Sequence, residues 1–299
     1  MAEEVFRSGF VGVVGRPNVG KSTLVNALVG RKVTIVSEKP QTTRNRILGV
    51  LNGPGYQMVL LDTPGMMEPR TELDQYMVKI ARGTLGDVDV VVLVVDGTAR
   101  PGPNERLLVA SFPRKAPPAV LALNKVDLLP PEKVPEAMEA YRALYPFRHG
   151  VPISALAGTN LDLLRQAIYD LLPPGPRYYP EDVTTDQPDH FYVAEVVREK
   201  VLELVRDEVP YAVAVVVEEI APRPNEVLYI RAYIFCERAG QRGILVGQNA
   251  RLLKTVGTRA RQELEAYFGK KIYLDLWVKV RRDWRDDPST LGQLGYRLK

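Results

Sequence analysis

The amino-acid sequence predicts an α/β protein with two domains, a doubly wound parallel sheet followed by a small α+β domain. Over the first 172 residues, apolar strand patterns alternate with helical patterns, and polar residues follow the strands. A proline-rich stretch then interrupts this alternation. Beyond it the predicted order is α-β-β-α-α-β, and 299 residues are enough for two separate cores.

The first predicted strand, residues 10–14, leads through a glycine-bounded loop into a helix that begins near Lys21. In this context the pattern G-x-x-x-x-G-K-[ST] binds phosphate, because its backbone N–H groups and the helix N-terminus face one anion. We expect Lys21 to reach the terminal phosphates and the Ser22 hydroxyl to bind Mg²⁺. The predicted nucleotide contacts here are Gly15, Arg16, Pro17, Asn18, Val19, Gly20, Lys21, Ser22 and Thr23.

A polar, irregular stretch (residues 31–41) precedes Thr42 and Thr43, either of which could be a second Mg²⁺ ligand. Two strand patterns, residues 47–51 and 56–61, flank an Asn-Gly turn and predict a hairpin. The second strand ends in an aspartate, where a Walker-B carboxylate holds Mg²⁺. The predicted site residues in this segment are Asp62, Thr63, Pro64, Gly65 and Met66.

Two apolar runs, residues 88–95 and 119–123, predict central parallel strands, and residues 151–153 predict a short one. Helices are expected between and after them, at residues 73–85, 104–112, 130–144 and 160–172. Polar residues at successive strand ends are therefore expected to meet at one edge of the sheet.

An Asn-Lys-x-Asp sequence follows the strand at residues 119–123 and favours guanine. The Asp127 carboxylate can accept two hydrogen bonds from the guanine edge, whereas adenine offers no such pair of donors. Asn124 is expected to contact N7 and brace the phosphate loop, the stem of Lys125 to pack on the base, and the Ala155 N–H to meet O6. The predicted guanine contacts are Asn124, Lys125, Val126, Asp127, Ser154 and Ala155.

The predicted boundaries are 1–172 for the nucleotide-binding domain, 173–187 for a linker and 188–299 for the second domain. Prolines exclude residues 173–180 from a helix or a central strand. In the second domain we expect helices at residues 191–205 and 251–268 and a helical turn at 241–246. Strands are expected at residues 211–220, 226–237 and 271–280.

The composition indicates a cytoplasmic protein. The single cysteine, Cys236, excludes a disulfide framework, and neither a signal peptide nor a membrane-spanning run is evident. Residues 270–299 hold eight Lys and Arg against four Asp, and residues 238–261 hold six Lys and Arg without a carboxylate. This basic third predicts either a polyanionic partner or a solvated face, and charge alone leaves both open.

The motifs GRPNVGKS, QTTR, DTPG, NKVD and ISA resemble those of the translation-factor-like GTPases, in the branch that includes Era, Der and the tRNA-modification GTPase. The later segments AEVVREK, ERAGQRGILVGQNARLLKTVG and KKIYLDLWVKVRRDWR are similar to the Era family, so the resemblance covers nearly the whole chain. It implies a P-loop GTPase domain followed by a type II KH domain. It also implies binding to the 3′ end of small-subunit (16S) ribosomal RNA during subunit maturation.

The resemblance places the RNA contacts in a loop that normally reads Gly-x-x-Gly, where this chain has Ala250 as the last residue. A methyl group disfavours positive φ, so we expect a right-handed helical conformation at Ala250. No stacked aromatic surface is evident, so base recognition is expected to use hydrogen bonds. The predicted RNA contacts are Gly247, Gln248, Asn249, Ala250, Arg251, Lys254, Arg281, Arg282 and Arg285.

Hydrolysis of GTP needs an oriented water and compensation of phosphate charge. Lys21 and Thr43 are predicted to compensate this phosphate charge. Thr43 is preferred to Thr42 because it directly precedes an arginine, as in the family. Met66 stands where Ras-type proteins have the water-orienting glutamine, which predicts slow intrinsic hydrolysis. The resemblance suggests a K⁺ ion held by Asn18 as compensation. Arg16 or Arg44 acting in cis, and acceleration by bound RNA, are the alternatives.

Two other functions stay open as alternatives. One is a signalling GTPase recruited to the inner face of the cell membrane, although Asp residues interrupt the basic C-terminal segment. The other is a tRNA-modification GTPase, which needs a further catalytic domain. We expect a monomer that does not bind DNA.

Overall fold

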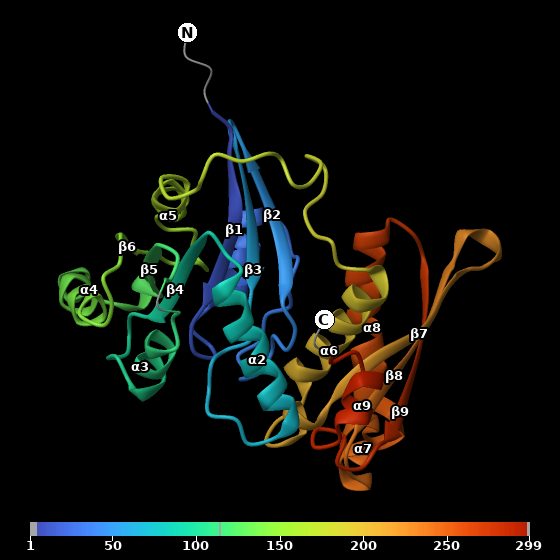
Figure 1. Cartoon of the computed structure of the whole chain (residues 1–299). Coiled ribbons are helices and arrows are strands. Elements are labelled where there is room, and N and C mark those ends of the chain that lie inside the picture. Colours follow the sequence, from blue (N-terminus) through green and yellow to red (C-terminus); the bar gives the residue numbers. More distant parts are fainter. Residues whose placement is uncertain (1–4, 114, 298–299) are drawn as a thin grey trace. The chain divides into compact units, whose positions relative to one another are not determined.

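A computed structural model describes residues 5–113 and 115–297, which form two compact units (Figure 1). The first unit comprises the described residues up to Arg70 together with Asp74–Asp186, and the second comprises Thr71–Leu73 and the residues from Gln187 onward. Each unit has a hydrophobic core of its own.

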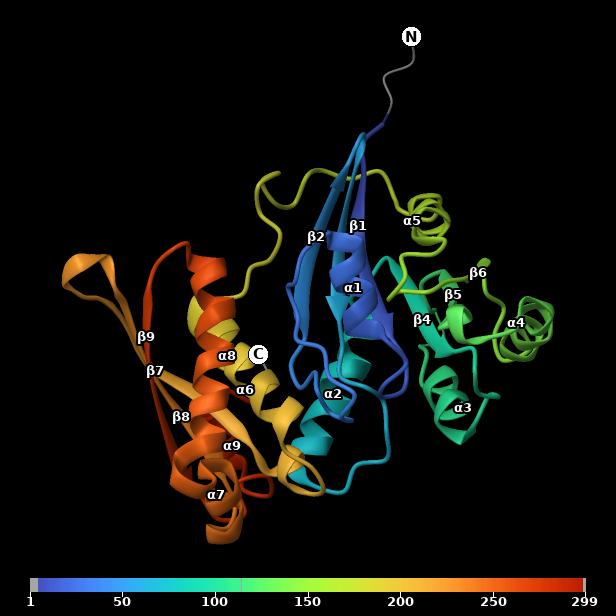
Figure 2. The same ribbon diagram turned by 180° about the vertical axis from the view of Figure 1, so that it is seen from behind.

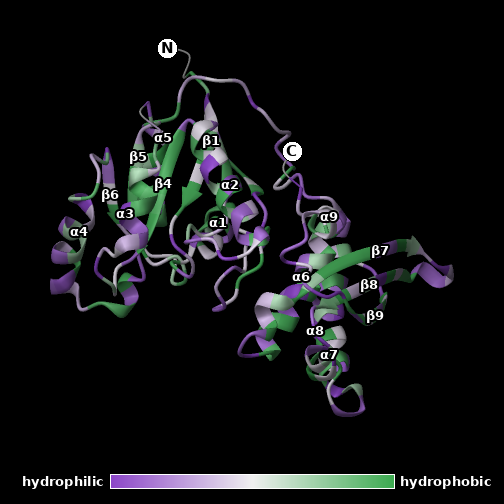
Figure 3. Cartoon of the chain, turned by 60° about the horizontal axis from the view of Figure 1, so that its bottom comes forward, coloured by the Kyte–Doolittle hydropathy of each residue, from purple (hydrophilic) through white to green (hydrophobic). Residues whose placement is uncertain are grey.

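The first unit contains a six-stranded sheet with the order β2-β3-β1-β4-β5-β6. β2 runs antiparallel to β3, and the other neighbours are parallel. Every residue of β4 is buried, as a strand covered on both faces requires, and Figure 3 shows it in the colour of hydrophobic residues. The strands are β1 (Arg7–Val14), β2 (Ile47–Gly53), β3 (Tyr56–Asp62), β4 (Val90–Asp96), β5 (Ala119–Asn124) and β6 (His149–Pro152).

Helices cover both faces of this sheet. α1 and α5 pack on one face, and α2, α3 and α4 pack on the other. Figure 1 shows α2 in front of the sheet, and Figure 2, from behind, shows α1 there. The predicted doubly wound α/β fold is therefore confirmed. The helices are α1 (Lys21–Val29), α2 (Glu72–Gly86), α3 (Pro103–Ala110), α4 (Val134–Arg142) and α5 (Leu161–Tyr169), with 3₁₀ turns at Val126–Leu128 and Pro131–Lys133.

The segment that follows α5 is hydrogen-bonded along the β2–β3 edge of the first unit. Gln57 on β3 accepts the backbone N–H groups of Tyr178 and Tyr179 at 2.8 and 3.0 Å. Farther along, Val50 N–H donates to the Thr184 carbonyl at 2.8 Å, within β2. Most of the stretch predicted as a linker, up to Asp186, is therefore part of the first unit.

The second unit contains a three-stranded sheet with the order β7-β8-β9, in which β8 pairs antiparallel with β7 and parallel with β9. α6 and α8 supply core side chains to one face of this sheet. The predicted order α-β-β-α-α-β is present, and α9, which begins after an Asp287 cap, is an addition that the sequence analysis missed. The elements are α6 (Asp189–Leu204), β7 (Ala214–Pro222), β8 (Leu228–Cys236), α7 (Ala239–Val246), α8 (Arg251–Phe268), β9 (Ile272–Val280) and α9 (Pro288–Gln293), with 3₁₀ turns at Val209–Ala212, Pro224–Glu226 and Gln248–Ala250.

Within the described residues, every helix is too short or too polar to cross a membrane.

Candidate nucleotide site and nucleic-acid interface

The loop between β1 and α1 is shaped by close backbone contacts. Gly20 has φ 96°, and a Cβ atom there would lie 2.3 Å from the Asn124 side-chain nitrogen. Only glycine therefore permits both this backbone conformation and the approach of that amide. The pocket above the loop is lined by Pro17, Asn18, Gly20, Lys21, Ser22, Thr23, Ile35, Val36, Ser37, Gln41, Thr42, Thr43 and Gly65.

Lys21 lies in this pocket as a buried cation. Its Nζ donates to the Arg16 carbonyl at 3.0 Å. Burial lowers the pKa of Lys21 to about 8, opposed by the Asp62 carboxylate and reinforced by the Arg16 charge. An anionic phosphate beside Nζ would restore the charged form, which is the role that the sequence predicts for this lysine.

A cluster of side-chain oxygens surrounds the end of β3. Asp62 Oδ2 accepts from Ser22 Oγ at 2.7 Å, from Thr34 Oγ1 at 3.1 Å and from Thr43 Oγ1 at 3.3 Å. Burial raises the pKa of Asp62, and its Oδ1 atom is buried without a hydrogen-bond partner among the described residues. Mg²⁺ prefers such hard oxygen ligands, so the residues present fit this ion.

The two candidate switch threonines have different partners. Thr43 Oγ1 lies 2.8 Å from Ser22 Oγ, inside the oxygen cluster. The Thr42 hydroxyl instead donates to the Lys39 carbonyl at 2.6 Å. This arrangement supports Thr43 as the switch ligand. Thr34, which also reaches Asp62, was missed because the stretch around it carries no recognisable pattern.

The residues after Asp62 lie directly against the phosphate loop. A Cβ atom at Gly65 would lie 2.7 Å from the Pro17 nitrogen, and Met66 N–H donates to the Gly15 carbonyl at 3.2 Å. The side chain of Met66 is buried in the core beneath α2, so it does not reach the pocket. Thr63 is buried as well, and its hydroxyl donates to the Val13 carbonyl at 2.9 Å.

Asn18 connects the phosphate loop to the stretch that precedes Thr42. It has a left-handed backbone, φ 62°, and its amide donates to the Glu38 carbonyl at 2.6 Å. The Asn18 amide oxygen and the Glu38 carbonyl oxygen therefore lie on hydrogen-bonded groups, of which Asn18 lines the pocket wall. Gln41 lines the same wall, with its amide nitrogen 2.7 Å from Asp74 Oδ1, and was not predicted.

Asn124 holds the ends of three segments together, as its predicted bracing role requires. Its Nδ2 donates to the Val19 carbonyl at 2.8 Å, and its Oδ1 accepts the Ala155 N–H at 2.9 Å. The Ala155 N–H, which is predicted to meet guanine O6, therefore donates to Asn124 in this structure. Ser154 supports the turn by accepting the Ala157 N–H at 3.1 Å.

Asp96, at the end of β4, joins the guanine and phosphate segments and was not predicted. Its Oδ2 atom lies 2.7 Å from Lys125 Nζ and 3.6 Å from Arg16 Nη2. Burial opposes ionisation of Asp96, but hydrogen bonds from Lys125 and Thr98 outweigh it and lower the pKa. Its position at a strand end, like that of Asp62, is the signal that could have identified it.

The two arginines considered for a role in cis are engaged elsewhere. Arg16 Nε forms a 2.8 Å ion pair with the buried carboxylate of Glu105, in addition to its contact with Asp96. Arg44 is 2% exposed. In this conformation Arg16 is held by its ion pairs and Arg44 is buried. Asp127, the residue predicted to select guanine, lies on an exposed 3₁₀ turn (Val126–Leu128) after β5. Its carboxylate is therefore accessible to a base.

In the second unit, the loop between α7 and α8 has positive φ at three of the four residues from Gly247 to Ala250. Gly247, Asn249 and Ala250 have φ 72°, 52° and 58°. The predicted right-handed conformation of Ala250 is wrong: with ψ 25° it is left-handed and directly precedes α8. The tight turn imposes this geometry despite the methyl group, which costs about 1–2 kcal/mol.

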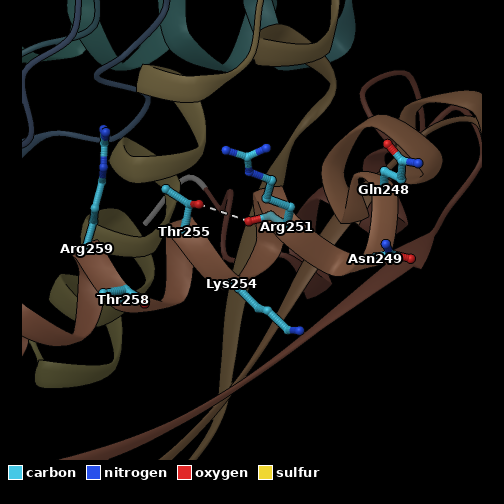
Figure 4. Close-up of a pocket in the computed structure, with 7 residues that line it drawn as sticks. All are labelled: Gln248, Asn249, Arg251, Lys254, Thr255, Thr258 and Arg259. Atoms are coloured by element: carbon cyan, nitrogen blue, oxygen red, sulfur yellow. Dashed lines mark hydrogen bonds between the residues drawn. The ribbon is translucent and has the colours of Figure 1, made fainter.

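An open groove runs from this loop along the first half of α8 (Figure 4). In that view Arg251 and Arg259 project to one side of the helix and Lys254 to the other, while the Thr255 hydroxyl donates to the Arg251 carbonyl. Three of the groove's seven lining residues were not predicted, although the four-residue spacing from Arg251 would have found Thr255 and Arg259. The groove is lined by Gln248, Asn249, Arg251, Lys254, Thr255, Thr258 and Arg259.

The three C-terminal arginines predicted to bind RNA have different surroundings. Arg285 forms a bidentate ion pair with Glu237, at 3.0 and 2.6 Å, so its charge is compensated within the second unit. Arg281 contacts Gln293, and Arg282 is exposed. Arg282 is therefore the most accessible of the three.

The first unit has the features of a guanine-nucleotide-binding protein: a phosphate loop on a doubly wound sheet, a cluster of oxygen atoms that suits Mg²⁺, and an Asn-Lys-x-Asp motif at the end of a strand. It is followed by a second, basic α+β domain. A family described as 50S ribosome-binding GTPase matches residues 10–125, and the KH domain family matches residues 208–285. GTPase Era of Geotalea daltonii is 47% identical over 99% of this chain and 100% of its own length. GTPase Era of Caldanaerobacter subterraneus is 45% identical over 98% and 99%. The chain belongs to the Era family of GTPases.

Solved structures agree with this assignment. The structure of Era in complex with MgGDPNP and nucleotides 1506–1542 of 16S ribosomal RNA superposes with a TM-score of 0.95 at 41% identity, covering 98% of this chain and all of that one. An Aquifex aeolicus Era variant bound to GDP and AlF₄⁻ gives 0.94 at 41% identity, over 98% and 100%. The predicted pairing of a P-loop GTPase domain with a KH domain is confirmed.

Proposed function

We propose that this chain is a GTP-hydrolysing switch that binds the 3′ end of 16S ribosomal RNA and assists maturation of the small ribosomal subunit. The observation that carries the proposal is the likeness, over 98% of this chain, to a solved Era that holds both MgGDPNP and nucleotides 1506–1542 of 16S ribosomal RNA. The proposed domains are residues 1–172, a connecting segment 173–187, and residues 188–299.

In the proposed mechanism, the backbone N–H groups of the phosphate loop and Lys21 hold the β- and γ-phosphates. Ser22, Thr43 and Asp62 would hold Mg²⁺, which neutralises phosphate charge when bound. Asp127 selects guanine, and Asn124 keeps the base-binding turn in register with the phosphate loop. The remaining predicted nucleotide contacts act mainly through their backbone, which suits Thr63, whose hydroxyl already donates to the Val13 carbonyl.

Intrinsic hydrolysis is proposed to be slow. The buried Met66 offers no group that can orient water, and the ion pair with Glu105 keeps Arg16 from substituting for it. A K⁺ ion bound by the Asn18 amide oxygen, with the nearby Glu38 carbonyl as a second ligand, is the proposed compensation. Bound RNA is the alternative accelerator.

For RNA, the proposed contacts are the loop Gly247–Ala250, together with Arg251 and Lys254 on α8 and the C-terminal Arg281 and Arg282. Backbone groups of such a loop approach the phosphates of about four nucleotides. We propose that the protein acts as a cytoplasmic monomer. A weak peripheral association with the inner face of the membrane stays a prediction, which a liposome sedimentation assay tests.

The test is crosslinking of the GTP-loaded protein to total RNA, followed by sequencing of the bound fragments. Enrichment of the 3′ end of 16S ribosomal RNA is expected, and it should be reduced when Gly247→Asp places a carboxylate in the loop. An even distribution over all RNA would refute the ribosomal assignment.

A further inference from the structure

The outer face of the β7-β8-β9 sheet carries aromatic side chains. On β8, Ile230, Ala232, Ile234 and Cys236 are buried against α6 and α8, while the alternate residues point to the opposite face. These outward residues are half-buried, and three of the four are aromatic. They are Tyr229, Arg231, Tyr233 and Phe235.

β9 adds a second aromatic row beside the first. Tyr273 and Trp277 are 63% and 56% exposed, unusually open for such large rings. The parallel register sets Tyr273 beside Tyr229 and Trp277 beside Tyr233. The two tyrosine rings of the first pair are nearly parallel, 15° apart, with centroids at 5.8 Å.

Acidic residues near this face form ion pairs with arginines. Arg231 lies 3.3 Å from Asp275 and 3.5 Å from Glu218, so one guanidinium is shared between two carboxylates. Glu219, on β7, is paired with Arg223 at 3.1 Å.

On β9 the two exposed rings lie between two lysines, and Asp275, which pairs with Arg231, lies between the rings. Lys271 and Lys279 flank the Tyr273–Trp277 row in the same alternating register, and Lys279 Nζ lies 3.3 Å from the Tyr233 ring centroid. Lys270, Arg281 and Arg282 lie next to the two ends of the strand. Exposed rings between cations suit bases that stack and phosphates that pair.

We propose that this outer face, centred on Tyr273 and Trp277, is a second contact surface for single-stranded RNA. Bases stack on the two rings while the flanking lysines contact phosphates. The two rings are four residues apart, about 13 Å along the strand, so they accept bases that are not adjacent in the RNA. α8, which forms the groove, packs against β9, so an RNA strand longer than the groove can pass the edge of β9 onto this face. The inference rests on the proposed RNA-binding function.

Trp277 makes this surface directly observable. The chain has two tryptophans, and the other, Trp284, is 0% exposed with its indole N–H donating to the Ala212 carbonyl. Neutral acrylamide therefore quenches mainly Trp277. Saturation with the twelve 3′-terminal nucleotides of 16S ribosomal RNA should reduce this quenching at least about twofold, because a stacked base shields the ring. Unchanged quenching at saturation would overturn the proposal.

Affinity measurements separate this surface from the groove. The double variant Tyr273→Ala/Trp277→Ala should bind the twelve-nucleotide RNA about tenfold or more weakly, whereas a four-nucleotide fragment should bind as in wild type. Tyr273→Phe/Trp277→Phe keeps the ring faces and should restore affinity. Leu163→Ala, at an exposed position of α5, is the matched control. Circular dichroism and unchanged GTP hydrolysis establish that the variants fold.

The outcomes distinguish this inference from the proposed function. If the wild-type protein fails to bind either RNA, the proposed function fails. If it binds both and the double variant does so equally well, only the second surface is refuted. If RNA-free ribosomal proteins shield Trp277 and RNA does not, the surface belongs to a protein partner and the proposal is wrong.

Discussion

The nucleotide site of the first unit and the nucleic-acid surfaces of the second unit are built from different parts of their folds. The nucleotide site gathers short motifs at strand ends, where Lys21, Asp62 and Asn124 converge although they are far apart in sequence. The groove and the aromatic face use residues at regular spacing along one helix and two strands. The first arrangement depends on a few irreplaceable atoms, and the second distributes binding over many similar contacts.

This comparison predicts that the largest loss of nucleotide affinity follows a small change in the residue that binds guanine. Asp127→Asn replaces an acceptor that guanine needs and should lower GTP affinity at least about 100-fold, because polar groups of the base are left unpaired. Xanthosine nucleotides, which present the complementary pattern, should gain affinity. Fluorescent-nucleotide titration measures both.

Glu132→Gln, at an exposed position beside the same turn, is the control and should change neither affinity. Equal weakening of guanine and xanthine nucleotides by Asp127→Asn would mean that the carboxylate supports the fold rather than the base.

The next prediction concerns the positioning residue Asp96. Asp96→Asn removes a charged partner of Lys125 and Arg16 and should weaken GDP binding about tenfold, the usual scale for a hydrogen bond between charged groups. RNA binding to the second unit should not change. Isothermal titration with GDP and with RNA measures the two effects separately.

Asp162→Asn, at an exposed position of α5, is the matched control. If Asp96→Asn binds GDP like wild type, the contacts with Lys125 and Arg16 have no function in nucleotide binding.

The buried state of Lys21 predicts a pH dependence of the same size. The pKa of this lysine is about 8 in the free site, and a bound phosphate raises it, so binding takes up a proton once the free lysine is neutral. GDP affinity in EDTA, which removes Mg²⁺ and its effect on Asp62, should fall about tenfold between pH 7 and 9. Titration in buffers of different ionisation enthalpy measures the proton uptake directly.

Lys21→Met should bind weakly at every pH and lose most of this slope. A wild-type affinity that rises with pH over this range would contradict the proposed protonation of Lys21.

The difference between the nucleotide site and the nucleic-acid surfaces also explains which of their residues the sequence could predict. Motifs at strand ends located Ser22, Asp62 and Asn124, because spacing and a neighbouring strand together restrict where such residues can lie. Asp96 was missed because a lone aspartate has no motif, and its function appears only once Lys125 and Arg16 reach it. The hydrogen bond from the Ala155 N–H to Asn124 was not predicted, because an acceptor on another strand is invisible in the sequence.

The aromatic face was missed for a different reason. Tyr229 and Tyr233 on one strand and Tyr273 and Trp277 on another each alternate with apolar residues, which resembles a buried strand. Only the parallel register of β8 and β9 brings the two rows together. The expectation that no aromatic surface exists was therefore wrong, because it considered each strand alone.

The smallest predicted effect lies in the loop before α8, where the structure overturned the expected conformation. Ala250→Gly relieves about 1–2 kcal/mol of left-handed strain but gives the unfolded chain about 0.4–1 kcal/mol of additional entropy, so the second unit should gain up to about 1.6 kcal/mol. Both tryptophans lie in this unit, so urea unfolding of the full chain followed by their fluorescence reports on it alone. Ala239→Gly, at the start of α7, is the control and should destabilise, because its backbone is helical. A loss of stability in Ala250→Gly would mean that the methyl group makes contacts that outweigh the strain of its left-handed backbone.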